Sequence, residues 1–172
     1  MVNFKKFSVF SVFILIFGLF IPKIIHAEET LKFGMADPLT GPAAIFGKDQ
    51  AQAVTWAVED INAAGGVRGR KLEAIILDHQ AKPEVGINAI NRLVEVEKVP
   101  VFITAFSNVV KAVAPIANRT ETLMFSVGAN APVIKELGDY VYTTFPLADV
   151  DMNKLPKYLS LIHISEPTRP FH

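Results

Sequence analysis

The chain has 172 residues, about the length of one domain, and its 17 Lys and Arg balance its 17 Asp and Glu. Residues 28–158 carry 13 basic and 16 acidic side chains, so neither a nucleic-acid-binding surface nor a polybasic membrane patch is indicated. The absence of cysteine excludes disulfides, thiol catalysis, Cys-based metal sites and the lipid attachment of a bacterial lipoprotein.

The first 27 residues have the pattern of a secretory signal peptide. Lys5 and Lys6 precede an uncharged apolar run from Phe7 to Ile21, and a short segment then ends at Ala27. An uncleaved membrane anchor is the alternative, but this run is shorter than the roughly 20 residues that a spanning helix needs. We therefore expect cleavage after Ala27 and export of the mature chain.

A strand, a loop and a long helix are predicted next. Residues 31–36 form a short apolar run, which the Pro- and Gly-containing loop 37–47 interrupts. Apolar residues then recur at spacings of three and four, the pattern of one helix face: Val54, Ala57, Val58 and Ile61. Gly65 and Gly66 end the helix, as expected of a left-handed C-terminal cap.

The rest of the chain continues the alternation of strands and helices. Strands are predicted at 72–77, 99–106, 122–127 and 140–145, and helices at 83–97, from 107 through 116, and at 133–137. Strict alternation predicts an α/β fold with a doubly wound parallel sheet, right-handed crossovers and strand order 2-1-3-4-5. Loops 37–47, 105–108 and 127–131 then meet at the carboxyl edge of the sheet, where such folds bind ligands.

These three loops carry the candidate binding residues. Ser107 and Asn108 start a helix, whose free N–H groups and dipole favour an anion. Gly128 permits close backbone approach, Asn130 offers an amide, and Phe46 offers an apolar surface. The residues are thus compatible with a carboxylate pocket beside a hydrophobic contact. In the alternative, Ser107 and Asn108 only cap the helix, and Gly128 and Asn130 only form a turn.

No catalytic arrangement stands out. His79 lies beside Asp78 at a strand end, where a lone histidine is more often a surface or hydrogen-bonded residue than a base, and no nucleophile elbow accompanies it. The segments GGVRG and GPAAIFG match neither the dinucleotide-binding fingerprint nor the P-loop. Asp149 and Asp151 fit a hinge or helix cap better than a carboxylate pair. We expect neither an enzyme nor a resident cofactor or metal.

Four motifs resemble a known family: LTGPAAIFG, INAAGGVRGRKLE, VVKAVAPIA and FSVGANAP. In this order, over roughly residues 31–159, the chain resembles type I periplasmic binding proteins, in particular the leucine/isoleucine/valine-binding proteins of branched-chain amino-acid ABC transporters. The resemblance implies two α/β lobes, with residues 28–158 forming the first and an amino acid or related carboxylate bound in the cleft between them. A periplasmic location and delivery to ABC permease subunits follow by the same resemblance.

The resemblance also implies roles for individual residues. The loop containing Ser107 and Asn108 and the segment Gly128–Asn130, with Ala129 in the middle, would bind the ligand carboxylate. Phe46 would cover the ligand side chain, and Asp149 matches an acidic position near the crossover to the second lobe. A ligand-binding domain of a sensor or receptor with the same fold is the alternative function. An exported enzyme on a similar sheet is a third, which would need a catalytic group at these loops.

The final residues depart from the family pattern. Leu159 to Arg169 reads LSLIHISEPTR, and all eleven residues match one reading frame of a transposon-end sequencing adapter. We expect residues 159–172 to be adapter translation rather than native sequence, and the second lobe to be encoded further along the gene. A genuine but unusual tail is the alternative.

Overall fold

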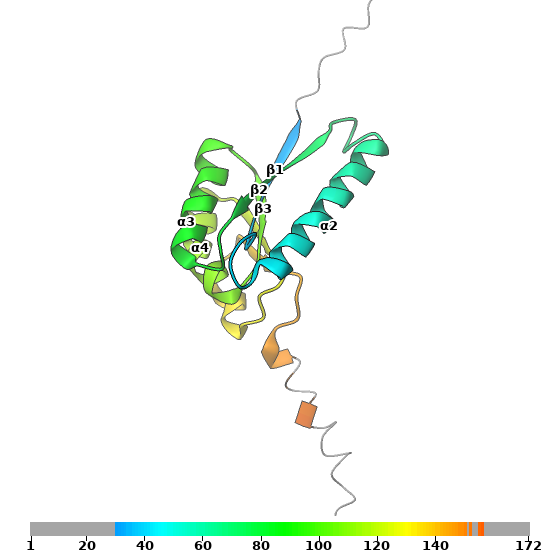
Figure 1. Ribbon diagram of the computed structural model, residues 1–172. Coiled ribbons are helices and arrows are strands. Elements are labelled where there is room, and N and C mark those ends of the chain that lie inside the picture. The colour runs from blue at the N-terminus through cyan, green and yellow to red at the C-terminus, as the bar shows by residue number, and fades with distance from the viewer. Residues whose placement is uncertain (1–29, 151, 153–154, 157–172) are drawn as a thin grey trace, which may run out of the picture.

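A computed structural model describes residues 30–150, 152 and 155–156, and it contains a five-stranded parallel sheet (Figure 1). The strands are β1 (Leu31–Asp37), β2 (Leu72–Asp78), β3 (Val101–Thr104), β4 (Leu123–Ser126) and β5 (Val141–Thr143). Their order is β2-β1-β3-β4-β5, and all neighbouring pairs are parallel. The predicted fold class and strand order are confirmed. The expected signal peptide, Asp151 and the expected adapter-derived tail lie outside the described residues.

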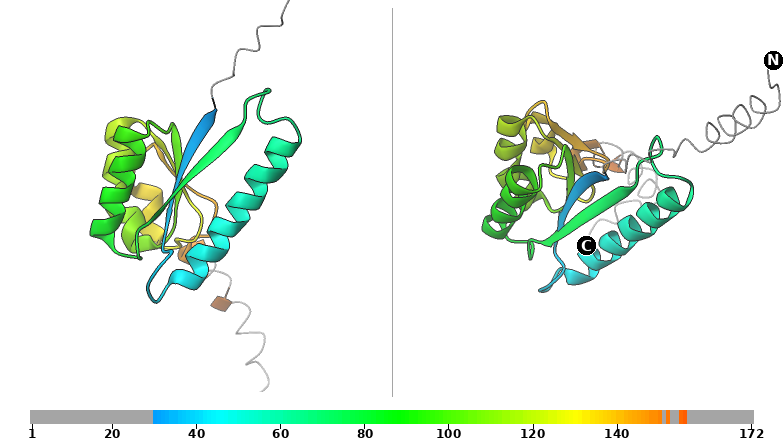
Figure 2. Two further views of the ribbon diagram at one scale, coloured as in Figure 1. Left: turned by 45° about the horizontal axis from the view of Figure 1, so that its top comes forward. Right: turned by 90° about the horizontal axis from the view of Figure 1, so that it is seen from above.

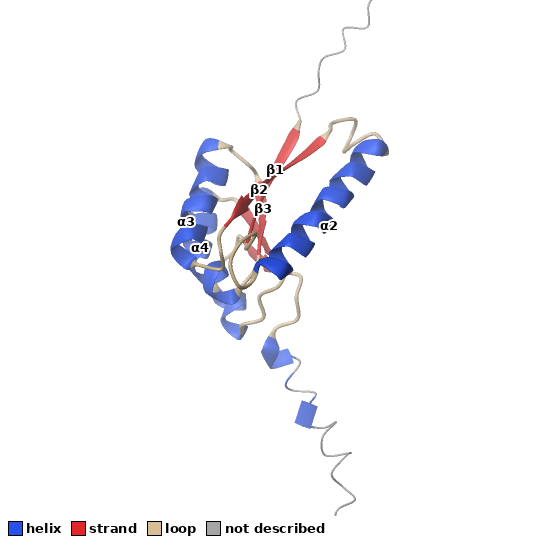
Figure 3. Ribbon diagram, in the orientation of Figure 1, coloured by secondary structure: helices blue, strands red, loops and turns tan. Residues whose placement is uncertain are grey.

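Helices cover the two faces of the sheet unequally (Figures 2 and 3). Helix α2 (Ala44–Ala63) packs on β1 and β2 from one side. Helices α3 (Pro83–Asn91) and α4 (Ser107–Thr120) pack together on the other side. Two further short helical segments are the π-helical turn η1 (Arg92–Val96) and the 3₁₀ helix η2 (Pro132–Glu136), and residues 148–150 are also helical.

The hydrophobic core lies between the sheet and the α3–α4 pair. Its largest fully buried apolar side chains come from β3, β4, α3, η1, α4 and η2: Phe102, Met124, Ile90, Leu93, Val109, Val110, Val113 and Ile134. Gly34 of β1 leaves room for this packing, because a Cβ there would lie 2.7 Å from Cδ1 of Leu93. Packing in this core holds the ends of β1 and β3, from which two of the loops at the carboxyl edge begin.

Helix α2 contacts the sheet along a narrower face than the sequence pattern predicted. Val54 and Val58 are half-buried as expected, but Ala57 is exposed and Ile61 retains 38% of its exposure. Gly47 is the one fully buried residue of α2, because its backbone lies against Pro38. Because α2 packs on two strands, β1 and β2, a single line of side chains along the helix makes its contact with the sheet.

The end of α2 confirms the predicted glycine cap. The N–H of Gly66 donates to the Ile61 carbonyl at 2.8 Å, and the N–H of Gly65 donates to Asn62 at 3.2 Å. Both glycines have positive φ, of 103° for Gly65 and 75° for Gly66. This pair of bonds is the Schellman arrangement. The Asn62 side chain then binds both backbone groups of Leu72, which fixes the start of β2.

The predicted helix 83–97 changes character at its end. It is α-helical to Asn91 and then continues as the wider π turn η1. In this turn the consecutive residues Leu93 and Val94 are both buried, whereas Val96 is 70% exposed instead of facing the core. Helix 133–137 is likewise a single 3₁₀ segment, and the last three strands are each shorter than predicted.

Candidate functional site

The carboxyl ends of β1, β3 and β4 bring the predicted loops together. The backbone N–H of Ala131 donates to Oγ of Ser107 at 3.3 Å, which joins the loop after β4 to the start of α4. A Cβ at Gly128 would lie 3.4 Å from Cβ of Ala105 and 3.3 Å from Nε2 of Gln50. The sheet edge therefore assembles residues from α2, the β3–α4 junction and the β4–η2 loop.

Ser107 and Asn108 do not cap α4, so the capping part of that alternative is wrong. The N-cap position belongs to Phe106, and the structure shows no side-chain hydrogen bond to the first turn of the helix. Asn108 instead donates through Nδ2 to the Ala81 carbonyl at 3.0 Å, toward the loop after β2. Within the part of the chain that the structure describes, the first-turn N–H groups of α4 are consequently without a side-chain acceptor, and they lie beside the half-buried Ser107 hydroxyl.

The segment after β4 presents its backbone to this position. Ala129 is buried, while Gly128 and Asn130 on either side of it are exposed. The Asn130 carbonyl accepts the N–H of Ala148 at 2.8 Å, which ties the end of the described chain to the same edge. The Asn130 side chain remains at the surface as a possible amide donor.

Gln50 is a member of this edge that the sequence reasoning missed. Its amide lies near Gly128, and its Oε1 is buried without a hydrogen-bond partner. Gln50 follows Phe46 by four residues, so the two lie one turn apart on α2. Phe46 itself is 62% exposed, which leaves its ring available at the start of that helix. The helical spacing from Phe46 was the signal that could have identified Gln50.

Asp149 lies near this edge, but its carboxylate is engaged elsewhere. Oδ2 of Asp149 accepts from Nζ of Lys135 at 3.0 Å, and this hydrogen bond is the largest cause that lowers the pKa of Asp149. Both side chains are at least one-third exposed. Asp149 follows Ala148, which is bound to Asn130, so the acid is close in the chain to the loop without contacting Ser107 through any bond found among the described residues.

Two ionisable side chains are completely buried behind the loops; of the two alternatives for His79, a surface residue or a hydrogen-bonded one, the surface alternative is wrong. Asp37 and His79 are both 0% exposed, and Oδ1 of Asp37 lies 3.8 Å from Nε2 of His79. Burial raises the pKa of Asp37 to about 7, and a contact with the Ala105 backbone opposes this rise. Burial lowers the pKa of His79, and the negative charge of Asp78 partly opposes that fall.

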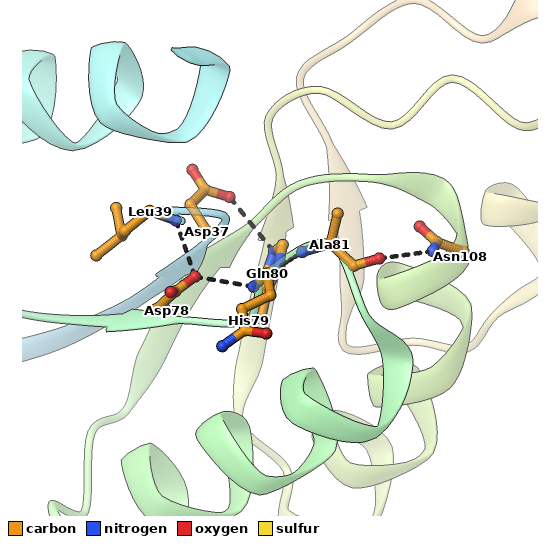
Figure 4. A network of polar contacts seen from close by, with 7 residues as sticks. All are labelled: Asp37, Leu39, Asp78, His79, Gln80, Ala81 and Asn108. Atoms are coloured by element: carbon orange, nitrogen blue, oxygen red, sulfur yellow. Dashed lines mark hydrogen bonds and ion pairs between the residues drawn. The ribbon is translucent and has the colours of Figure 1, made fainter. Parts of the chain in front are cut away.

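Asp78 organises the loops around this pair (Figure 4). Its Oδ1 accepts the N–H of Leu39 at 2.9 Å and the N–H of Gln80 at 2.8 Å, and Oδ2 accepts the Thr40 hydroxyl. Burial alone would raise the pKa of Asp78, but these hydrogen bonds outweigh it and lower the pKa. An ionised Asp78 therefore joins the loop after β1 to the loop after β2.

This arrangement suits binding better than catalysis. The side chains and backbone groups at the edge are neutral donors at the positive end of a helix, which favours a small anion. His79, the one histidine among the described residues, is buried behind these loops, out of reach of a ligand at the surface. Within the described residues, no three His, Asp or Glu side chains come together as metal ligands. In that same part of the chain, no helix is long and apolar enough to cross a membrane.

Comparison with known proteins gives the same family as the sequence motifs. The model of a family described as periplasmic binding proteins matches residues 30–160. A leucine-, isoleucine-, valine-, threonine- and alanine-binding protein of Pseudomonas aeruginosa is 33% identical over 112 residues. That alignment covers 65% of this chain and 30% of the relative.

Solved structures share the fold. A branched-chain amino acid transporter substrate-binding protein of Streptococcus pneumoniae, in complex with isoleucine, has a TM-score of 0.66 at 23% identity. The structural alignment covers 69% of this chain and 34% of the Streptococcus protein. A solute-binding protein of an ABC transporter from Rhodopseudomonas palustris BisB5, in complex with 3,4-dihydroxybenzoic acid, has a TM-score of 0.63 at 27% identity. The structural alignment covers 69% of this chain and 32% of the Rhodopseudomonas protein.

The chain spans about 30% of the length of the curated relatives it matches. The match to the family model is nevertheless continuous from the first strand onward, and it includes all three loops at the carboxyl edge. The chain therefore belongs to the periplasmic binding protein family.

Proposed function

We propose that this chain is the first lobe of an exported solute-binding protein that binds an amino acid or a related small carboxylate and delivers it to ABC permease subunits. The observation that carries the proposal is the uncapped first turn of α4, with Ser107 joined to the backbone of the loop after β4. The first turn of α4 and the loop after β4 meet at Ser107, and N–H groups at the start of a helix favour a carboxylate, which supports the proposal.

The comparisons support the same chemical class of ligand. Isoleucine and 3,4-dihydroxybenzoic acid, named in the two solved structures, differ in their side groups but share a carboxyl group. The relative from Pseudomonas is named for five aliphatic or small amino acids. We therefore assign the carboxylate to Ser107, Asn130 and the backbone of residues 128–129, and the ligand side chain to the surface beside Phe46 and Gln50.

Two residues of the expected site take modified roles. Asn108 is bound to the Ala81 carbonyl, so we assign it to support of the loop rather than to ligand contact. Asp149 is paired with Lys135, and we place it at the exit toward the second lobe, where the pair would have to open for direct ligand contact. The second lobe supplies the ammonium contacts in this proposal, and closure of the two lobes retains the ligand.

The experiment begins with the complete gene. Resequencing the source DNA across codons 150–172 recovers the native reading frame, and the full-length product is purified. Thermal shift and calorimetry then test leucine, isoleucine, valine and 3,4-dihydroxybenzoate. We expect at least one carboxylate to bind with micromolar or tighter affinity. Loss of binding by the corresponding amide would show that the carboxylate is recognised, whereas equal binding of acid and amide would contradict the proposal.

Variants locate the binding position. Ser107→Ala should weaken carboxylate binding about tenfold or more, because a hydrogen bond to a charged group is lost. Thr120→Val is the matched control, since it removes a hydroxyl at the opposite end of α4. Equal affinities of the two variants would place the ligand elsewhere. Uptake of the bound compound by cells with and without the gene tests delivery to the permease.

A further inference from the structure

A buried acid and a buried histidine lie immediately behind the loop that leads to Ser107, and ligand contact does not account for them. Asp37 ends β1 and His79 follows β2, and both have no exposed surface. Among the described residues, the Asp37 carboxyl makes no hydrogen bond of good geometry beyond its contact with the Ala105 backbone, and Nε2 of His79 has no hydrogen-bond partner, although Oδ1 of Asp37 lies only 3.8 Å from it. Buried polar atoms without partners are costly, so their retention calls for an explanation.

The contacts of His79 fix where its proton lies. Its Nδ1 accepts the N–H of Ala81 at 3.0 Å, so a neutral ring carries its proton on Nε2. Nε2 is the atom that faces Oδ1 of Asp37 (Figure 4). The backbone N–H of His79 also donates to the Asp37 carbonyl at 3.1 Å. The two residues thus form one unit across the ends of β1 and β2.

This unit contacts both residues that precede Ser107. The Asp37 carboxyl meets the backbone of Ala105, and the His79 ring meets the Phe106 ring edge-on, with centroids 6.3 Å apart. Phe106 has a φ of 68°, which is uncommon for a bulky residue and persists only where neighbours enforce it. Asp37 and His79 are therefore placed to hold the backbone that presents Ser107 and the first turn of α4.

We propose that Asp37 and His79 are a positioning pair behind the ligand loop, and that the proton held by Asp37 controls how strongly the site binds a carboxylate. The proposal rests on the proposed function, because it takes the anion to be bound at Ser107. It adds a dependence on pH that does not follow from the residues at the surface of the site.

In the described part of the chain, few charged groups other than Asp78 surround the Asp37–His79 pair. Asp78 is the last residue of β2, and its negative charge acts on His79. The polar residues at the end of β3 and the start of α4 are uncharged: Thr104, Ser107 and Asn108. Helix α3 approaches His79 at Gly86, whose built Cβ would lie 3.8 Å from Cβ of His79. The charged side chains on the neighbouring helices are exposed: Lys48, Asp49, Glu84 and Lys111.

The direction of the effect follows from like-charge repulsion. Burial raises the pKa of Asp37 to about 7, so the carboxyl changes charge close to neutral pH. Below that pH it is neutral and leaves the positive end of α4 available to the ligand. Above it, an ionised Asp37 adds a negative charge behind the same loop, which disfavours a second carboxylate. Affinity should therefore decrease as the pH rises through neutrality.

The test measures binding of the tightest carboxylate found for the full-length protein, by calorimetry from pH 5.5 to 8.5. The carboxyl group of the ligand stays ionised over this range, so its titration does not contribute to the pH dependence. We expect about three- to tenfold weaker binding at pH 8.5 than at pH 5.5. A tenfold change corresponds to a shift of one unit in the pKa of Asp37 when the carboxylate binds. Asp37→Asn should remove this dependence, whereas the exposed control Asp60→Asn should retain it. The same slope in the wild type and Asp37→Asn would overturn the proposal.

A second measurement needs no ligand and separates the two proposals. If no carboxylate binds at any pH, the proposed function fails, and amide NMR shifts of residues 105–107 then decide the positioning role. Shifts that titrate near neutral pH in the wild type, and do not titrate in Asp37→Asn, would support it. The absence of a titration in the wild type would overturn it. His79→Gln, which keeps a side-chain donor, should displace the Phe106 amide signal at every pH.

Discussion

Asp37 is a residue whose ionisation opposes folding. Its carboxyl has a pKa of about 7 in the folded chain, because burial disfavours the charged form, whereas an unfolded Asp titrates near 3.9. Between these pH values Asp37 is protonated in the folded chain but ionised in the unfolded chain. The contribution of Asp37 to the free energy of unfolding therefore decreases as the pH rises from about 4 to about 7 and then remains constant. The residue is retained at a cost that its proposed role in binding would explain.

Asp37→Asn should therefore stabilise the protein more at pH 8 than at pH 5. The amide carries no charge, so it avoids the penalty that the ionised carboxyl has above neutrality, a gain of at most a few kcal/mol. Thermal unfolding at the two pH values measures the difference, with the exposed Asp60→Asn as the control. An equal gain at both pH values would show that charge is not the cause.

The end of α2 shows how an element is terminated by backbone conformation. Gly65 and Gly66 both have positive φ, but only Gly66 is closely packed: a Cβ there would lie 2.1 Å from the Arg70 carbonyl oxygen. At Gly65 there is no heavy atom within 4 Å of a built Cβ. The two positions therefore separate backbone strain from steric overlap in one turn.

Gly66→Ala should destabilise the chain more than Gly65→Ala. The latter carries only the penalty of a left-handed conformation, about 1 kcal/mol. The former must also move the turn that forms the Val67–Arg70 bridge and leads into β2, which adds about 1–3 kcal/mol. Urea unfolding of the two variants gives the comparison. If both lose the same free energy, the contact with Arg70 is not maintained in solution.

Periodicity predicted the elements well, and local contacts explain where it was wrong. The alternation of strands and helices identified the whole sheet order, because apolar runs and glycine turns are local signals. The burial of His79 and the cap position of Phe106 depend on neighbours distant in the sequence. Ser107 was placed at the correct helix start, but its partner, the N–H of Ala131, could be identified only in the fold. Contact of Ser107 and the other site residues with a ligand stays a prediction.

At the scale of the whole molecule, the sheet is covered on one face and partly open on the other. Helices α3 and α4 cover the core side, while α2 extends over β1 and β2 alone (Figure 2). On the α2 side, the rings of Phe125 and Tyr142 stack with centroids 5.7 Å apart, and Tyr142 remains 49% exposed. We expect later segments of the full-length protein to cover this surface, as the resemblance to two-lobed binding proteins implies.

This uncovered face should bind a hydrophobic dye in the 172-residue chain once residues 1–27 are removed. Anilinonaphthalene sulfonate fluoresces when it binds exposed apolar surface, and the aromatic pair on β4 and β5 offers such a surface. Tyr142→Thr keeps a strand-forming residue and should reduce the fluorescence at least twofold. The control Val133→Thr changes a 39%-exposed side chain on η2, away from that face, and should leave the signal unchanged. The full-length protein should bind less dye per molecule than the chain described here, since covering segments exclude it. Equal dye binding by the chain and the full-length protein would mean that this face stays open, and that the sheet is complete with α2 alone.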